Sequence, residues 1–111
     1  MNINEFIKKN NIAIVARADL SNKSFEIIKR DLELESYDLF EQLIIYGTVD
    51  NLVASTEGQI LPRIWTQGKS KCVITYDNNE HIVALFYENS MDAKENYFYA
   101  KQLDLLLKEV I

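Results

Sequence analysis

Cysteine, histidine, proline and glycine are all scarce in this sequence. Its 111 residues include one cysteine, one histidine, one proline and three glycines. The single cysteine, Cys72, excludes an internal disulfide and a thiolate metal site, and a lone histidine among scattered carboxylates argues against other metal sites. So few turn-forming residues also leave little room for long loops. We expect short connections, no metal and no cofactor.

Positive charge and long apolar runs are equally limited. The chain has 12 Lys and Arg against 17 Asp and Glu, which gives a formal net charge of −5. Nucleic acid and anionic membranes are therefore poor default partners, because phosphates must be met by clustered basic residues. No segment approaches the ~20 apolar residues of a membrane span, and the N-terminus lacks an apolar run of signal-peptide length. We expect a cytoplasmic protein with neither nucleic acid nor membrane as a partner.

The composition that remains is that of an ordinary globular protein. Hydrophobic residues make up 48% of the chain and charged residues 26%, which suits one domain over residues 1–111. In the N-terminal third, residues 2–9 suggest a short helix, residues 12–16 a strand and residues 19–23 a turn. Residues 24–34 fit a helix or a strand, and periodicity alone leaves both open.

A long helix is the clearest expectation of the central region. Its apolar spacing runs from about residue 37 to residue 56, with Ser36 as an N-cap and Gly58 as a left-handed residue after its end. Gly47 lies inside this segment, where a glycine costs about 1 kcal/mol relative to alanine. It marks either close packing against another backbone or a tolerated, helix-ending position.

Three strands and a final helix complete the chain. The strands are expected at residues 60–67, 72–76 and 81–87, and the helix at 91–110 with Ser90 as its cap. The helical stripe expected to face the sheet is Tyr99, Leu103, Leu106 and Val110. Both faces of the last two strands are apolar, so helices, or a helix and a partner chain, should cover both sides. The sequence therefore predicts an α/β (α+β type) sandwich around an antiparallel sheet.

Catalytic motifs fail on spacing or context. Gly68-Lys69-Ser70 matches the end of a phosphate-binding loop, but the position that requires the first glycine holds Arg63, and a strand rather than a helix follows. Cys72 and His81 form the only available Cys/His pair. We interpret Cys72 as a buried, inert thiol and His81 as a half-exposed polar residue at a strand start. We expect no catalytic residue and no enzymatic activity.

Trp65 is the most informative residue for function. Alternation places it beside Arg63 on one face of strand 60–67, and Pro62 indicates that this strand is an edge or is irregular at its start. Trp and Arg are enriched among the residues that dominate binding energy at interfaces. The alternative, that Trp65 packs under a helix of its own chain, stays open.

The order helix, strand, strand, helix, three strands, helix resembles the Roadblock/dynein light-chain superfamily. The best-matching part runs from Ser36 to Ile111 and contains the central helix, the meander PRIWTQGKSKCVITYDNNEHIVALFY and the helix MDAKENYFYAKQLDLLLKEV. The resemblance implies a five-stranded antiparallel sheet with helices on both faces, whose first strands are residues 12–18 and about 24–31. The family's glycine-containing turn between them is replaced by Ser-Asn-Lys. If residues 24–34 are helical, a profilin-like arrangement fits equally.

Such a resemblance implies a non-enzymatic scaffold or regulator. Members of the family form homodimers through the central helix and the following edge strand, and often bind or regulate small Ras-like GTPases. Carried onto this chain, the dimer surface involves helix 39–53 and strand 60–67, with the candidate interface residues Phe40, Ile44, Gly47, Arg63 and Trp65. Two hypotheses compete with this one. The first is a small acidic inhibitor or immunity-type protein that binds a basic partner, and the second is an enzyme or ligand binder with an unrecognised pocket.

Overall fold

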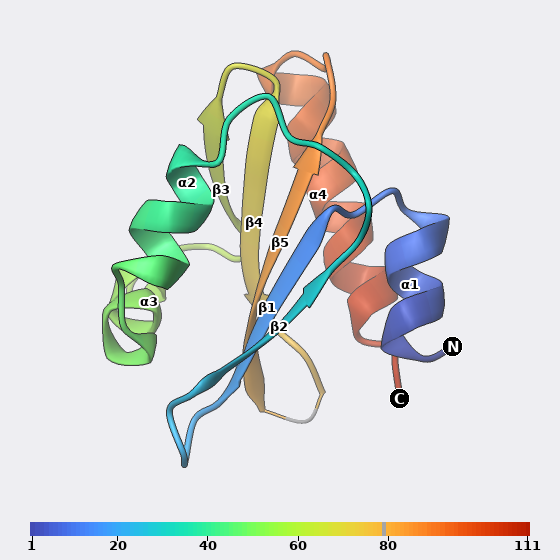
Figure 1. The fold of residues 1–111 in the computed structure, drawn as a ribbon. Coiled ribbons are helices and arrows are strands. Elements are labelled where there is room, and N and C mark those ends of the chain that lie inside the picture. The colour runs from blue at the N-terminus through green and yellow to red at the C-terminus, as the bar shows by residue number, and fades with distance from the viewer. Residues whose placement is uncertain (79) are drawn as a thin grey trace.

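The computed structural model describes residues 1–78 and 80–111, which are arranged around one antiparallel sheet (Figure 1). The strands are β1 (Ile14–Asp19), β2 (Phe25–Lys29), β3 (Arg63–Gln67), β4 (Ser70–Tyr76) and β5 (His81–Glu88). Their order is β2-β1-β5-β4-β3, and every neighbouring pair is antiparallel. β2 and β3 are therefore the two edges, and the predicted five-stranded sheet with β3 at an edge is confirmed.

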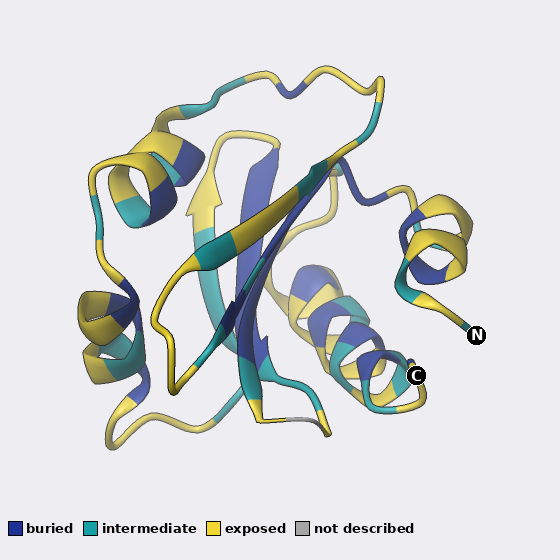
Figure 2. Ribbon diagram, turned by 60° about the horizontal axis from the view of Figure 1, so that its bottom comes forward, coloured by how far each residue is buried: buried dark blue, intermediate teal, exposed yellow. Residues whose placement is uncertain are grey.

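Helices cover both faces of this sheet (Figures 1 and 2). They are α1 (Ile3–Lys9), α2 (Asp38–Phe40), the π-helical turn η1 (Glu41–Ile45), α3 (Val49–Thr56) and α4 (Ala93–Leu107). α1 and α4 pack on one face, whereas α2, η1 and α3 pack on the other. The predicted sandwich is confirmed.

Alternation along the central strands builds two separate cores. Val73 pairs with Leu85 and both side chains lie in the core under α1 and α4. Cys72, one residue before Val73, pairs with Phe86, one residue after Leu85. Both side chains lie in the core under α2, η1 and α3. Because successive strand residues point to opposite faces, continuous apolar runs such as these require two covers.

The ambiguous segment 24–34 contains strand β2, which pairs along β1 with Ile27 opposite Ala16. The turn before it is held by an Asx contact, in which the Asp19 carboxylate accepts a 2.7 Å hydrogen bond from the Ser21 N–H. Lys23 adopts the left-handed conformation with a φ of 56°. These contacts form the turn without the glycine that the family pattern contains.

The single helix expected over residues 37–56 is wrong, because the segment breaks at Gly47. The Tyr46 N–H donates to the Glu41 carbonyl at 2.8 Å, a π-type bond that closes η1. Thr48 then leaves the helical conformation, and its hydroxyl accepts from the Asn51 N–H at 3.1 Å to cap α3. A threonine side chain that bonds the backbone ahead of it favours a new N-terminus over continuation. Gly47 therefore ends a helix, one of the two interpretations considered above.

The last helix begins two residues later than expected. Asp92, not Ser90, is its N-cap, because the Asp92 carboxylate accepts from the Glu95 N–H at 2.8 Å in a capping box. The buried positions of α4 are Asn96, Ala100, Leu103 and Leu107, so the predicted stripe is right at Leu103 and Val110. Tyr99 and Leu106 only flank this core. The buried Asn96 was not anticipated; its side-chain oxygen accepts from the Tyr87 hydroxyl at 2.8 Å.

Candidate functional site

The free edge of β3 is the first element of the candidate site. β3 pairs with β4 from Arg63 opposite Ile74 to Gln67 opposite Ser70, and it has no strand on its other side among the described residues. Pro62 directly precedes it. An unpaired edge presents a row of N–H and C=O groups to solvent, and proteins either protect such edges or pair them.

Arg63 and Trp65 lie together on the side of β3 that faces α2, η1 and α3. The Arg63 guanidinium stacks over the indole at 4.6 Å from the ring and donates a 2.6 Å hydrogen bond to the Ser55 carbonyl of α3. Trp65 is half-buried against the core on this side. Its ring N–H is buried and has no acceptor among the described residues. The own-chain packing considered for Trp65 is thus present, but part of the ring and the backbone edge remain open.

Phe40 and Ile44, two of the expected interface residues, are core residues. They are 6% and 4% exposed, and the Phe40 ring meets the Phe86 ring edge-on at 5.3 Å. A partner cannot reach these side chains without opening the core. The expected interface set is therefore brought together only in part, since Arg63 and Trp65 are adjacent at the edge while Phe40 and Ile44 lie beneath the helical cover.

The residues that η1 presents to solvent were missed from the sequence. Ile45 is 51% exposed and Tyr46 is 80% exposed. A notch of about 150 Å³ lies between η1 and α3 and is lined by Tyr46, Gly47 and residues of both elements. A Cβ on Gly47 would approach the Leu43 carbonyl oxygen to 2.4 Å, so this tight junction requires glycine. The signal was present in Leu43-Ile44-Ile45-Tyr46, where four consecutive apolar residues exceed what one helical stripe can bury.

Charge distinguishes this cover from the rest of the molecule. Residues 31–62 contain no Lys or Arg and seven acidic residues: Asp31, Glu33, Glu35, Asp38, Glu41, Asp50 and Glu57. Asp50 is partly neutralised by Lys23 at 3.1 Å. The side-chain carboxylates of Glu41 and Glu57 have no hydrogen-bond or ionic partner within residues 1–78 and 80–111. The exposed apolar residues of η1 therefore lie on a segment of the chain that carries acidic residues and no basic ones.

The Gly68-Lys69-Ser70 segment is a turn between two strands. Gly68 has a φ of 61°, and β4 begins at Ser70. The Lys69 N–H donates to the Glu35 carboxylate at 3.2 Å, and the Ser70 hydroxyl accepts from the Ser36 N–H at 3.0 Å. These hydrogen bonds hold the loop before α2 in place. Strand β4, not a helix, follows the turn, so no helix N-terminus is there to bind phosphate.

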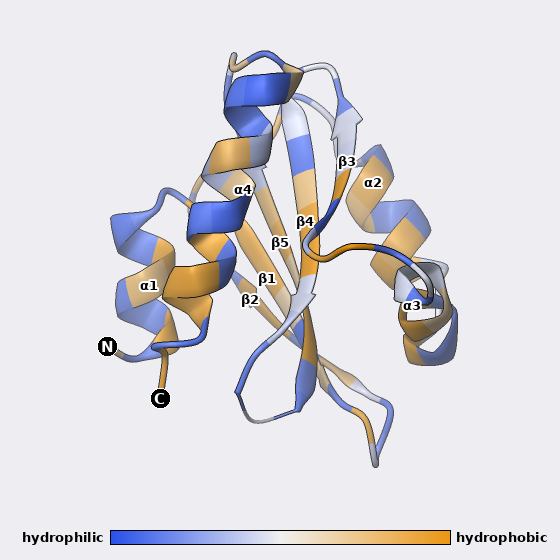
Figure 3. Cartoon of the chain, turned by 180° about the vertical axis from the view of Figure 1, so that it is seen from behind, coloured by the Kyte–Doolittle hydropathy of each residue, from blue (hydrophilic) through white to orange (hydrophobic). Residues whose placement is uncertain are grey.

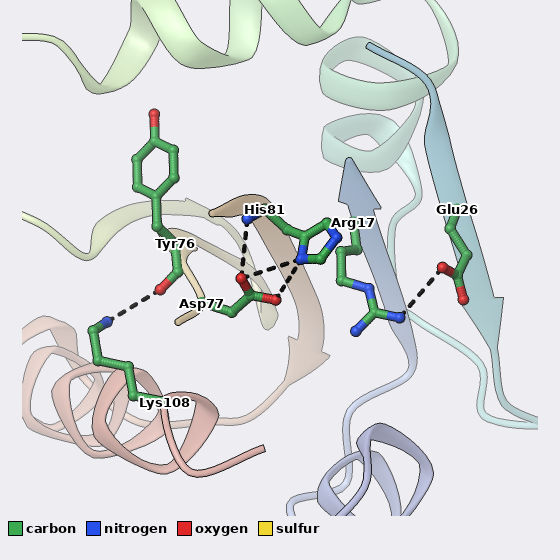
Figure 4. A network of polar contacts seen from close by, with 6 residues as sticks. All are labelled: Arg17, Glu26, Tyr76, Asp77, His81 and Lys108. Atoms are coloured by element: carbon green, nitrogen blue, oxygen red, sulfur yellow. Dashed lines mark hydrogen bonds and ion pairs between the residues drawn. The ribbon is translucent and has the colours of Figure 1, made fainter. Parts of the chain in front are cut away.

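Cys72 and His81 do not meet. Cys72 is fully buried on the α2 side, and burial raises the pKa of its thiol well above the ordinary value. His81 lies on the opposite face, as alternation from Val83 requires, with its Nδ1 3.0 Å from the Asp77 carboxylate (Figure 4). Nucleophile and base are separated by the sheet, so the pair cannot act as a catalytic dyad.

The hollow beside the loop before α2 offers little specific chemistry. A hollow of about 390 Å³ lies at one end of the sheet, between the loop before α2 and the loop before α4, and its lining is mainly polar. Across the described parts of the chain, no three His, Cys, Asp or Glu residues gather as a metal site would need. No helix in those parts combines the length and apolar character needed to cross a bilayer.

Comparison with known proteins identifies the fold. Neither protein-family models nor curated proteins give a match. Among solved structures, MglB of Myxococcus xanthus superposes with a TM-score of 0.53 at 13% sequence identity, covering 95% of this chain and 87% of that one. At this identity the likeness shows the fold alone. The fold is Roadblock-like, as the sequence resemblance indicated.

Proposed function

We propose that this chain, with its Roadblock-like fold, is a non-enzymatic interaction module of the cytoplasm that acts as a homodimeric scaffold or regulator of a small Ras-like GTPase. The Roadblock-like fold supports the proposal, because this is the role that the resemblance of the sequence to the Roadblock family implies. The observation that carries the proposal is the unpaired edge of β3 with the Arg63–Trp65 stack beside it. The separation of Cys72 from His81 supports a non-enzymatic role.

Two copies can pair through β3 across a two-fold axis. β3 of one copy would lie antiparallel to β3 of the other, so that the two sheets become continuous and the open edge is satisfied. A two-residue turn joins Gln67 to Ser70, so alternation of hydrogen-bonded pairs should leave the N–H groups of Ile64 and Thr66 directed away from β4. These are the donors that a second β3 would use.

The side chains proposed for this surface have different parts in it. Arg63 and the open part of Trp65 would contact the partner copy directly. Gly47 would allow close approach beside the notch. Phe40 and Ile44 would contribute from beneath, by fixing α2 and η1 on the sheet.

A proline in β3 tests the pairing with little change to the monomer. Thr66 is exposed, and proline is tolerated on an edge strand where the N–H faces solvent. Thr66→Pro should therefore give a folded monomer. Thr66→Val is the matched control, because it keeps the N–H and a β-branched side chain and should remain dimeric. Light scattering over a range of concentrations measures both, and circular dichroism confirms folding.

Two outcomes would contradict the homodimer. One is a wild-type protein that stays monomeric at micromolar concentration. The other is a folded Thr66→Pro variant that dimerises as strongly as Thr66→Val.

The GTPase partner needs its own test. Calorimetric titration with Ras-like GTPases loaded with GDP or with a non-hydrolysable GTP analogue should show binding that depends on the bound nucleotide. Equal binding of the two forms would argue against a regulator. No binding by any GTPase from the same source would overturn this part of the proposal while leaving the dimer intact.

The acidic segment 31–62 favours one alternative, a small inhibitor or immunity-type protein that neutralises a basic partner. Carboxylates without internal partners, such as Glu41 and Glu57, would then face Lys and Arg of that protein. This function predicts tight binding that weakens steeply with salt and does not depend on nucleotide. The titrations above distinguish the two functions.

A further inference from the structure

A group of charged side chains lies at the end of the sheet that carries the β1–β2 turn. Figure 3 shows this turn projecting beyond the ends of α1, α3 and α4. A hollow of about 250 Å³ lies beside it and is lined by Arg17, Asp19, Glu26 and His81, together with residues of the turn. We call it the hairpin hollow. Because β2 and β3 are opposite edges of the sheet, the hairpin hollow lies outside the surface proposed for the homodimer.

The strand register places the four charged side chains in two neighbouring rows. Arg17 pairs with Glu26 on β2, and Asp19 pairs with His81 on β5. Because Arg17 and Asp19 are two residues apart on β1, both rows lie on the same face of the sheet. Directly opposite residues are about 5 Å apart at their Cβ atoms. Groups of both signs therefore surround one small space.

Arg17 has fewer acceptors than its burial requires. Its side chain is only 20% exposed, and a guanidinium carries five N–H donors. Among the described residues it bonds only the Glu26 carboxylate, 3.3 Å from Nη2, and its Nε is buried with no acceptor. Buried donors without acceptors are costly. The guanidinium therefore favours a ligand that brings acceptor oxygens, and a carboxylate suits it because it can accept two parallel N–H bonds.

The second row offers acceptors to a cation. The Asp77 carboxylate lies 3.0 Å from Nδ1 of His81, so in the neutral ring Nδ1 carries the proton and Nε2 has the free lone pair. Nε2 is on the side of the ring toward Arg17 (Figure 4). The Asp19 carboxylate accepts from the Ser21 N–H and hydroxyl through Oδ1, so Oδ2 is not used in these two bonds. An ammonium group, which has three donors and no acceptor, fits this row.

We propose that the hairpin hollow binds a free α-amino acid. Its carboxylate would bind the Arg17 guanidinium in place of the exposed Glu26 carboxylate. Its ammonium would donate to Asp19 and to Nε2 of His81. The site does not rest on the function proposed above.

The lining selects for a ligand that carries both charges. An anion alone would be repelled by Asp19 and Glu26, and a cation alone would be repelled by Arg17. A peptide fits less well, because it carries only one of the two groups at each end. The volume of about 250 Å³ lies below the roughly 300–1,000 Å³ of sites for drug-sized ligands, which suits a small molecule.

L-Alanine and two single-charge analogues test the requirement for both groups. Propionate lacks the amine of alanine, and ethylamine lacks its carboxylate. His81 is the only histidine of the chain, so its ring protons report on the hollow in NMR titrations, with the Arg17 Nε–H signal as a second reporter. We expect saturable shifts of both with L-alanine. Propionate and ethylamine should bind at least about tenfold more weakly, since each loses one set of charged hydrogen bonds.

Arg17→Lys tests the same site by substitution in the full chain. Lysine keeps the charge and the long side chain but cannot make two parallel bonds to a carboxylate, so L-alanine should bind about tenfold more weakly. Arg30→Lys, outside the hollow, is the matched control and should bind as wild type does. The His81 ring protons measure binding in both variants, and circular dichroism confirms that both are folded.

Three results would overturn the proposal. The first is the absence of any saturable shift of the His81 ring protons with L-alanine. The second is propionate or ethylamine binding as tightly as L-alanine, which would make the hollow a site for one charge only. The third is equal binding of L-alanine by Arg17→Lys and Arg30→Lys. None of these results bears on the pairing through β3, whose tests use other residues.

Discussion

The two helical covers of the sheet are built differently. On one face, α1 and α4 are regular helices, and each begins with a capping box, at Asn2 and at Asp92. On the other face, the cover is divided into α2, η1 and α3, with a π-helical turn and a break at Gly47. The central strands β4 and β5 present apolar residues to both covers. The second cover contacts the edge strand β3 through the Arg63–Ser55 hydrogen bond and leaves Ile45 and Tyr46 exposed.

This difference suggests that one cover mainly stabilises the fold and that the other also provides a binding surface. The regular cover satisfies its backbone ends and buries Leu103 and Leu107 in line. The irregular cover holds the core through Phe40 and Ile44 but turns neighbouring residues outward. π-turns of this kind are frequent at functional sites. We therefore attribute binding to the second cover and its adjoining edge strand.

The largest loss of stability is expected when a core residue of the irregular cover (α2, η1 and α3) is truncated. Phe40→Ala should lower the free energy of unfolding by about 3–5 kcal/mol, because it leaves a cavity against Phe86. Tyr46→Ala, six residues later but 80% exposed, should change stability by no more than about 0.5 kcal/mol. Urea denaturation measures both. Equal costs for the two substitutions would show that Phe40 is not a core residue in solution.

A smaller loss is expected at the break between η1 and α3. Gly47→Ala should destabilise the protein by about 1–3 kcal/mol, since a Cβ would press on the Leu43 carbonyl and force the backbone to shift. Gly58→Asn is the matched control. Gly58 has a φ of 70° with open space around it, and asparagine tolerates that conformation. If Gly47→Ala were as stable as wild type, the tight junction would be contradicted.

A substitution at the N-cap of α4 tests the start of this helix in the regular cover. Asp92→Ala should cost about 1 kcal/mol, because it removes the acceptor of the Glu95 N–H at the start of α4. Ser90→Ala should be neutral within about 0.5 kcal/mol. Thermal unfolding followed by circular dichroism compares the two variants. The reverse order of effects would place the helix start at the residue that the sequence suggested.

The smallest effect concerns pH at the turn between β1 and β2. Hydrogen bonds from the Ser21 hydroxyl and N–H lower the pKa of Asp19 below its ordinary value of 3.8. The stabilisation is therefore present above the unfolded-state pKa and is lost as the pH falls through the lower, folded-state pKa. Carbon NMR titration should show the Asp19 carboxyl protonating at lower pH than in Ser21→Ala. Identical titrations would contradict this assignment.

Most of the fold was predictable because the sequence is consistent at several levels. The two-sided apolar strands near Val73 and Leu85 required two covers, and Pro62 identified the edge. Residues 24–34 could not be assigned locally, because only pairing with β1 favours the strand. The break after Gly47 was hidden by an apolar spacing that continues through it, although the π-turn before Gly47 and the Thr48 cap after it interrupt the helix.

The candidate site was predictable only at the edge strand. Arg63 and Trp65 were found because alternation places them together in an interface-like composition. Phe40 and Ile44 were assigned to the interface through the family resemblance, which identifies the helix but not which of its sides faces outward. Ile45 and Tyr46 lie outward because Phe40 and Ile44 occupy the buried side of this segment, and the apolar spacing did not show which residues of the run Leu43–Tyr46 would be buried.

Hydrogen exchange at the two sheet edges tests the central claim most directly. If copies pair through β3, the backbone N–H groups of Ile64 and Thr66 should exchange more slowly as protein concentration rises, while the outer N–H groups of β2 keep a constant rate. NMR resolves both edges in one sample. Exchange at β3 that is independent of concentration, in a protein that light scattering shows to be dimeric, would contradict the account.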